Sequence, residues 1–271
     1  MKIIFLFILL PIIYYYGKYI YIMNSPNMGV PVNWDCNKAD MEINRNSTKI
    51  FLGVFTKEDN YNRRQIIRDT YLKNKSNNVI FKFITGRPTT KKFINEIKEY
   101  HDILPLDIKE NMNKGKTYEY FYTIAEIFNN YNLDFVIKAD DDSYIRLDLM
   151  EKDLNTTNNK MSYWGYLVGN TFMGGECYGL SFDLVKWIHN SNITRKNKYG
   201  HEDSQVQKWF VWDKINNNIT YETRNCVIHD EITSNTVYSK NISKKSMVVH
   251  YIKKDKIFID VHYKISKYLL K

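Results

Sequence analysis

Residues 135–142 have the sequence FVIKADDD, in which a short apolar segment runs directly into three consecutive aspartates. The apolar residues Phe135–Ile137 predict a short buried strand that leads into the aspartate triplet. Adjacent carboxylates raise each other's pKa, and a divalent cation removes that conflict. A solvated acidic turn that caps the next helix is the alternative, but the buried strand before the aspartates disfavours it. The stretch therefore predicts oxygen ligands for a hard cation such as Mn2+ or Mg2+ at a strand end.

Strand-like and helical patterns alternate on the amino-terminal side of this stretch. Apolar or alternating segments predict strands at 49–56, 79–85, 103–108 and 135–137, and helical spacing predicts helices at 61–72, 93–100 and 117–131. Alternation of this kind is typical of an α/β domain with a largely parallel sheet. Ligands of such sheets bind beyond the carboxyl ends of the strands, and Asp140–Asp142 lie at such an end.

The composition limits the classes of protein to consider. With 271 residues, 25% charged and 44% hydrophobic, the chain is neither disordered nor collagenous, and it can form one large α/β domain with a tail. The net charge of +9 is spread along the chain without a concentrated basic stripe, so we expect no nucleic-acid partner. Three cysteines are too few for a disulfide scaffold, and no Cys/His cluster suggests zinc.

The amino-terminal segment predicts a membrane anchor. Ile3–Tyr16 is uninterrupted by charge, and the apolar segment reaches spanning length if Lys18 extends toward the headgroups. We therefore expect a short cytosolic tail and an uncleaved signal-anchor helix over 1–23, a stem over 24–45, and a folded luminal domain over 46–271. A cleaved signal peptide is the alternative, although no small-residue cleavage site follows the apolar segment.

Both interpretations place the rest of the chain in the secretory lumen. N-x-[S/T] sequences, which permit such a location, begin at Asn46, Asn74, Asn155, Asn192, Asn218 and Asn241. An oxidising lumen would allow one disulfide, and Cys177 with Cys226 is the pairing that we expect.

Four further groups of residues could carry chemistry. Arg63, Arg64 and Arg68 lie on the helix after the first strand, where they could contact a diphosphate or form a solvated helix face. Gly174-Gly175 could let the backbone approach a sugar ring or form a turn. Glu202-Asp203 opens a helical segment, where acidic residues also act as caps. His250 ends a short strand-like segment, and such a histidine can be structural.

In order along the chain, these residues resemble motifs of the β-1,3-galactosyltransferase family, which is glycosyltransferase family 31 and is related to Fringe. The resemblance runs from about Lys49 to His250. The similar motifs are RQIIRDTY at 64–71 (R-x-x-I-R-x-T-W), Asp102-Ile103-Leu104 with Asp107 and Lys116-Thr117, FVIKADDD at 135–142 (K-x-D-D-D), GGECYGLS at 174–181 (G-G-x-x-Y-x-L-S), and Glu202-Asp203 (E-D-V-x-x-G).

The resemblance implies a GT-A fold, in which a Rossmann-like nucleotide half is continuous with an acceptor half. It implies a single-pass type II membrane enzyme of the Golgi or ER, with its catalytic domain in the lumen. The implied reaction is metal-dependent transfer of a hexose, galactose or N-acetylglucosamine, from a UDP-sugar to a glycan or glycoprotein acceptor. A β-1,3 linkage would form with inversion at the anomeric carbon.

The resemblance also assigns roles to individual residues. Asp142 and His250 would ligate the Mn2+ or Mg2+ ion, and Asp203 would be the general base that deprotonates the acceptor hydroxyl. The residues expected to bind the UDP-sugar are Arg64, Arg68, Lys138, Asp140, Asp141, Gly174, Gly175 and Glu202.

The chain departs from the family pattern on the acceptor side. Ser204 and Gln207 stand where the family has Val and Gly, Tyr71 replaces a Trp, and the segment 164–174 lacks the usual Lys-Trp-Tyr loop. A catalytically inactive luminal protein of the same fold that binds sugars or nucleotides is therefore the alternative function. A metal-dependent phosphoesterase is a weaker one, because the sequence lacks the additional ligands of a two-metal site.

Overall fold

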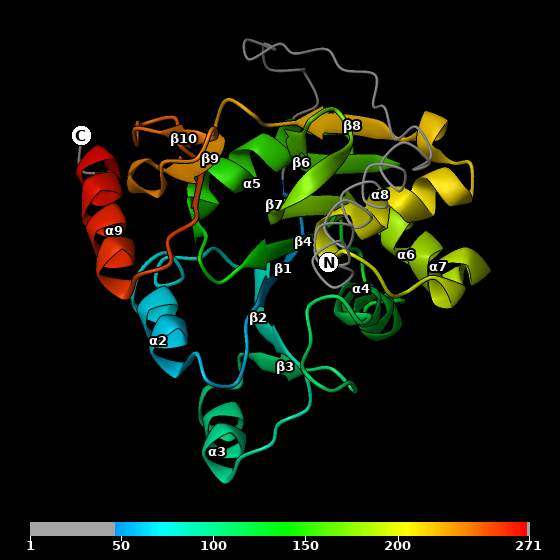
Figure 1. The fold of residues 1–271 in the computed structure, drawn as a ribbon, viewed down its shortest axis with the longest axis horizontal. Coiled ribbons are helices and arrows are strands. Elements are labelled where there is room, and N and C mark those ends of the chain that lie inside the picture. Colours follow the sequence, from blue (N-terminus) through cyan, green and yellow to red (C-terminus); the bar gives the residue numbers. More distant parts are fainter. Residues whose placement is uncertain (1–46, 270–271) are drawn as a thin grey trace, which may run out of the picture.

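The computed structural model describes residues 47–269, and its centre is a seven-stranded sheet in the order β3-β2-β1-β4-β7-β6-β8 (Figure 1). Its first four strands run parallel: β1 Ile50–Phe55, β2 Val79–Thr85, β3 Ile103–Pro105 and β4 Phe135–Asp140. The four strands expected from the sequence are therefore confirmed. β4 is longer than expected, because Lys138–Asp140 continue the register with Gly53–Phe55 of β1.

The other half of the sheet is mostly antiparallel. β7 (Phe172–Ser181) runs antiparallel to β4 and to β6 (Ser162–Val168), and β8 (Thr220–Thr223) lies parallel to β6. The result is a mixed but mainly parallel sheet. It agrees with the expected α/β class.

A second, four-stranded sheet has the order β10-β9-β11-β5. Its strands are β5 Tyr144–Ile145, β9 Ile228–Glu231, β10 Ser239–Lys240 and β11 Val248–His250. β5 begins two residues after Asp142, and Val249 of β11 pairs with Tyr144. This small sheet therefore brings the end of β11, which lies more than 100 residues later in the sequence, beside the aspartate triplet.

Helices cover both faces of the central sheet, because its strands alternate apolar side chains between two cores (Figure 1). Ile50, Leu52 and Val54 pack in one core with the helices α2, α5 and α9, while Phe51 and Phe55 pack in the other with α4, α6 and α8. The helices are α2 Tyr61–Asp69, α3 Lys91–Tyr100, α4 Lys116–Ile127, α5 Leu147–Thr156, α6 Phe182–Asn190, α7 Asn192–Lys196, α8 Glu202–Trp212 and α9 Asp255–Leu269, with 3-10 turns at 216–218 and 232–234.

The predicted anchor over 1–23 and stem over 24–45 lie outside the described residues. Among residues 47–269, no helix combines the length and apolar character that crossing a membrane would need.

The predicted pairing of Cys177 with Cys226 is wrong. Cys177 is a free thiol on β7, completely buried in the core beneath the central sheet. Cys226 is disulfide-bonded, and it lies in the turn between β8 and β9. The sequence could not show that the strand buries the sulfur of Cys177 among apolar side chains.

Candidate functional site

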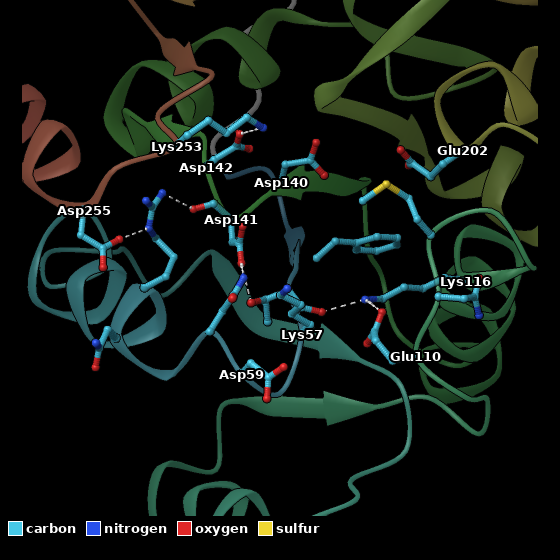
Figure 2. A pocket seen from close by; sticks show the side chains of 17 residues that line it. Lys57, Asp59, Glu110, Lys116, Asp140, Asp141, Asp142, Glu202, Lys253 and Asp255 are labelled. Atoms are coloured by element: carbon cyan, nitrogen blue, oxygen red, sulfur yellow. Dashed lines mark hydrogen bonds and ion pairs between the residues drawn. The ribbon is translucent and has the colours of Figure 1, made fainter. Parts of the chain in front are cut away.

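A pocket of about 700 Å³ opens where the parallel strands end (Figure 2). It lies beyond the carboxyl ends of β1 and β4, and it is lined also by the first turns of α2, α4 and α8 and by the segment after β11. Ligand pockets commonly have a volume of ~300–1,000 Å³. Of the residues predicted for the site, Asp140, Asp141, Asp142 and Glu202 line this pocket directly.

Asp140, Asp142 and His250 form a cluster that could hold a metal ion. Each offers one ligand atom, and these atoms lie within 4.8 Å of one another. His250 reaches the aspartates because β11 pairs with β5, and the Ile252 amide donates a hydrogen bond to the Asp142 carbonyl at 3.0 Å. The predicted metal residues are thus brought together, although 108 residues of sequence separate Asp142 from His250.

The surroundings of His250 hold its ring in a defined orientation. Its Nδ1 lies 2.7 Å from Asp230 Oδ1, and its Nε2 lies 3.6 Å from Asp142 Oδ1. Burial alone would lower the pKa of His250, but the hydrogen bond with Asp230 and the charge of Asp142 raise it. A carboxylate behind a histidine is the usual support of a metal-ligating ring. Two carboxylates and a supported imidazole therefore fit a divalent cation such as Mn2+.

Asp141 points away from this cluster. Its Oδ2 accepts hydrogen bonds from Thr56 Oγ1 at 2.6 Å and Asn60 Nδ2 at 2.7 Å. Its carbonyl accepts a third from Arg63 at 3.1 Å. These contacts tie the end of β4 to β1 and α2, so the middle aspartate shapes the pocket wall.

Lys138 is completely buried beneath the triplet. Its ammonium contacts Asp140 Oδ1 at 2.7 Å, the Gly175 carbonyl at 2.7 Å and Glu202 Oε1 at 2.9 Å. These contacts occupy the three hydrogen-bond donors of a lysine. Lys138 therefore joins the end of β4 to the start of α8 and does not line the pocket.

Glu202 and Asp203, at the start of α8, have pKa values shifted in opposite directions. Burial raises the pKa of Glu202 despite the charge of Lys138. Burial also acts to raise the pKa of Asp203, but a hydrogen bond with Glu202 and the charge of Lys138 outweigh it, and the pKa falls below its ordinary value. When two neighbouring acids are separated in this way, the one with the lower pKa is the carboxylate available to accept a proton.

The predicted glycines allow this helix start to approach β7. A Cβ placed on Gly175 would lie 2.0 Å from Asp203 Oδ1 and 3.0 Å from Glu202 Oε2. On Gly174 it would lie 2.2 Å from Glu176 Oε2. Any larger residue would displace these carboxylates, so the glycines serve the packing of acidic side chains at the site.

Arg64 and Arg68 are not brought to the pocket. Arg64 is completely buried and pairs with Glu96 of α3 at 2.6 Å, and Arg68 pairs with Glu96 at 3.0 Å and with Asp102 at 2.8 Å. Arg63, the third basic residue predicted on this helix to contact a diphosphate, does line the pocket. The error arose because helical position alone cannot show that α3 packs its acidic residue against this side of α2.

Glu176 is a further acid at the site that sequence reasoning missed. It precedes Cys177, which pairs with Ala139 of β4, so it lies beside the end of that strand. Burial raises the pKa of Glu176 from its ordinary 4.5 to about 7, and the charges of Asp203 and Asp140 add to this effect.

We expect Glu176→Gln to change the free energy of unfolding of the metal-free protein more favourably at pH 8 than at pH 5. The folded state holds a proton on Glu176 that the unfolded state releases, so this residue makes the free energy of unfolding fall as the pH rises from about 4.5 to 7. Glutamine does not titrate, so the variant lacks this loss, and its effect on the free energy of unfolding should differ between the two pH values by roughly 1–3 kcal/mol. Urea unfolding in the presence of a chelator measures the effect. Asp260→Asn, on an exposed part of α9, is the control, and equal changes at both pH values for Glu176→Gln would contradict the assignment.

Comparison with known proteins shows that the chain is similar to galactosyltransferases. A family model described as Galactosyltransferase matches residues 62–170. The probable beta-1,3-galactosyltransferase 12 of Arabidopsis thaliana is 25% identical over 200 residues, which cover 59% of this chain and 53% of that protein. The probable beta-1,3-galactosyltransferase 13 of the same plant is 25% identical over 235 residues, which cover 71% and 68%. The chain thus spans about half the length of the first relative and about two thirds of the second.

These matches confirm the resemblance to the β-1,3-galactosyltransferase family that the sequence predicted. The family model includes the aspartate triplet but ends before Gly174, Asp203 and His250. Among solved structures, the WbbM bifunctional glycosyltransferase superposes with a TM-score of 0.51 at 10% identity, over 84% of this chain and 52% of that one. This likeness concerns the fold, a glycosyltransferase-like α/β architecture.

Proposed function

We propose that this chain, which resembles the β-1,3-galactosyltransferase family, is a metal-dependent GT-A glycosyltransferase. It transfers a hexose, galactose or N-acetylglucosamine, from a UDP-sugar to a glycan or glycoprotein hydroxyl and forms a β-1,3 linkage with inversion. The observation that carries the proposal is the Asp140, Asp142 and His250 cluster at the carboxyl ends of parallel strands, beside a pocket of about 700 Å³. The predicted anchor over 1–23 and a Golgi or ER luminal location complete the proposal and rest on the sequence alone.

The donor half of the site would be the pocket between β1, β4 and α2. Asp140, Asp142 and His250 would hold Mn2+ or Mg2+, which supplies positive charge for the departing diphosphate. Asp141 and Arg63 would keep the pocket wall in place, since they cross-link β4, α2 and the segment after β11. Arg64 and Arg68 would act through the stability of α2 and not by contact with the nucleotide.

The acceptor half would centre on the start of α8. Asp203 would take the proton from the acceptor hydroxyl as its oxygen attacks the anomeric carbon. The bond between that carbon and the diphosphate oxygen breaks, and UDP leaves with the electron pair. One base and one leaving group are sufficient for inversion, so no second nucleophile is required. The lowered pKa of Asp203 supports this role, because it favours the unprotonated carboxylate that a general base needs.

We expect Asp142→Ala to weaken Mn2+-dependent binding of UDP by roughly tenfold or more, because it removes one of the metal ligands. Calorimetric titration of UDP with and without Mn2+ measures this. Asp59→Ala, which removes an exposed carboxylate that also lines the pocket, is the control and should bind UDP like the parent. Equal affinity of Asp142→Ala and the parent in Mn2+ would refute the metal site.

A panel of UDP-sugars, tested for Mn2+-dependent hydrolysis and for transfer to glycan and glycoprotein acceptors, tests the function itself. The same panel examines the alternative of a non-catalytic binding protein. That alternative is favoured by the short connection between β6 and β7, where only residues 169–171 lie between the strands. Binding of a UDP-sugar without turnover would support it.

A further inference from the structure

Lys253 provides a positive charge inside the proposed metal site. Its ammonium pairs with Asp142 Oδ2, while the other oxygen of Asp142 faces His250. Asp142 is nearly buried, with 10% of its side chain exposed, whereas the side chain of Lys253 is 59% exposed. Figure 2 shows this lysine reaching over the triplet from the segment after β11. A metal ligand is thus already neutralised by a cation from the chain itself.

The backbone around Lys253 is held on both sides, whereas its exposed side chain is held only through its ammonium, which pairs with Asp142 and lies 4.6 Å from the centre of the Tyr251 ring. The amide of Ile252 donates to the Asp142 carbonyl at 3.0 Å, and the carbonyl of Ile252 accepts from Arg63 at 2.8 Å. Asp255 pairs with the same arginine at 2.8 Å. The exposed four-carbon side chain can therefore turn between Asp142 and the pocket without any change in the fold.

We propose that Lys253 is a built-in competitor of the metal, which neutralises Asp142 in the metal-free protein and turns to the diphosphate when metal and nucleotide bind. The inference rests on the proposed function for the identity of the metal and the nucleotide. A divalent cation that binds alone must displace the ammonium and then lie near it, and both effects weaken binding. A diphosphate gives the displaced ammonium a new partner, since Lys253 also lines the pocket.

Metal and nucleoside diphosphate should therefore bind cooperatively. The coupling is reciprocal, so UDP strengthens the binding of Mn2+ by the same factor by which Mn2+ strengthens the binding of UDP. Lys253 increases this coupling in two ways. It weakens the binding of Mn2+ alone, and it strengthens the binding of Mn2+ and UDP together.

The test is titration of the full chain with Mn2+, monitored by the electron paramagnetic resonance of free Mn2+, in the absence and presence of UDP. Lys253→Met should bind Mn2+ alone roughly 2- to 5-fold more tightly than the parent, the size expected for removing one largely exposed charge. It should also gain less affinity for Mn2+ from UDP than the parent does, because it lacks the ammonium that would contact the diphosphate. Lys253→Arg keeps the cation and should behave more like the parent.

Lys254→Met is the matched control, because it removes one positive charge from the adjacent exposed residue, which does not line the pocket. Its affinity for Mn2+ should equal that of the parent. Unchanged or weaker binding of Mn2+ alone by Lys253→Met would overturn the proposal, as would an equal gain in Lys254→Met.

Failure of the proposed role of Lys253 can be distinguished from failure of the proposed function. If Lys253→Met gains affinity for Mn2+ but no UDP-sugar is turned over, the proposed role of Lys253 is supported and the proposed enzymatic function is refuted. If the parent turns over UDP-sugars and Lys253→Met gains nothing, only the competitor fails. If neither protein binds Mn2+ with or without UDP, both fail.

Discussion

Asp203→Asn is expected to reduce sugar transfer by roughly 10²- to 10⁴-fold, the contribution of a positioned general base. Asparagine has nearly the same size, so it preserves the close packing against Gly175 but cannot accept the acceptor proton. Affinity for Mn2+ and UDP should stay within about twofold of the parent, because Asp203 is not among the proposed metal ligands. Single-turnover transfer from a UDP-sugar, with parallel calorimetry, separates the two effects.

Two further variants make this result specific. Asp213→Asn removes a carboxylate at the other end of α8 and should transfer sugar at the parental rate. Glu202→Gln retains a hydrogen-bond donor toward Asp203, so it should cost less activity than Asp203→Asn. If Asp203→Asn still transfers sugar and Glu202→Gln does not, Glu202 and not Asp203 is the general base.

Lys138→Met is expected to lower the free energy of unfolding by roughly 3–5 kcal/mol, the usual cost of removing one partner from a buried ionic cluster. Methionine leaves Asp140 and Glu202 without their shared cation and the Gly175 carbonyl without its donor. A loss of this size lowers the melting temperature by roughly 10 °C in a domain of this length. Differential scanning fluorimetry and urea unfolding measure it.

The double variant Lys138→Met with Glu202→Gln tests the cause of this loss. Removing one of the two unpaired carboxyl charges should recover part of the stability, because the two side chains are in direct contact. Lys152→Met on the exposed surface of α5 is the control for the substitution itself. A melting temperature unchanged by Lys138→Met would contradict the role of Lys138 as the shared counter-ion.

The parallel strands and the aspartate triplet could be predicted because their signals are local. The strand at 79–85 agrees with the structure at both ends, and the triplet follows its strand as expected. Apolar runs bounded by polar residues report burial directly, without knowledge of the partner that buries them. The elements after residue 212 were mostly missed, because β8, β9 and β10 have two to four residues each and carry little periodicity.

The arginines of α2 show where local signals fail. The same pattern of residues predicted Arg64 and Arg68 as diphosphate ligands, yet they hold Glu96 and Asp102 together inside the domain. Charge and helical position are the same for a structural ion pair and for a ligand-binding residue. Only the element packed against that face of the helix distinguishes the two.

The residue sequence alone was sufficient for the α/β class, the strand that ends in three carboxylates, and the family resemblance, since each depends on neighbours along the chain. Tertiary structure alone decided that His250 lies beside Asp142, that Lys138 joins the end of β4 to the start of α8, and that Lys253 pairs with Asp142. These contacts connect residues 37 to 111 positions apart. They exist because the small sheet and α8 fold back onto one strand end, and no short-range pattern records where a strand finds its neighbours.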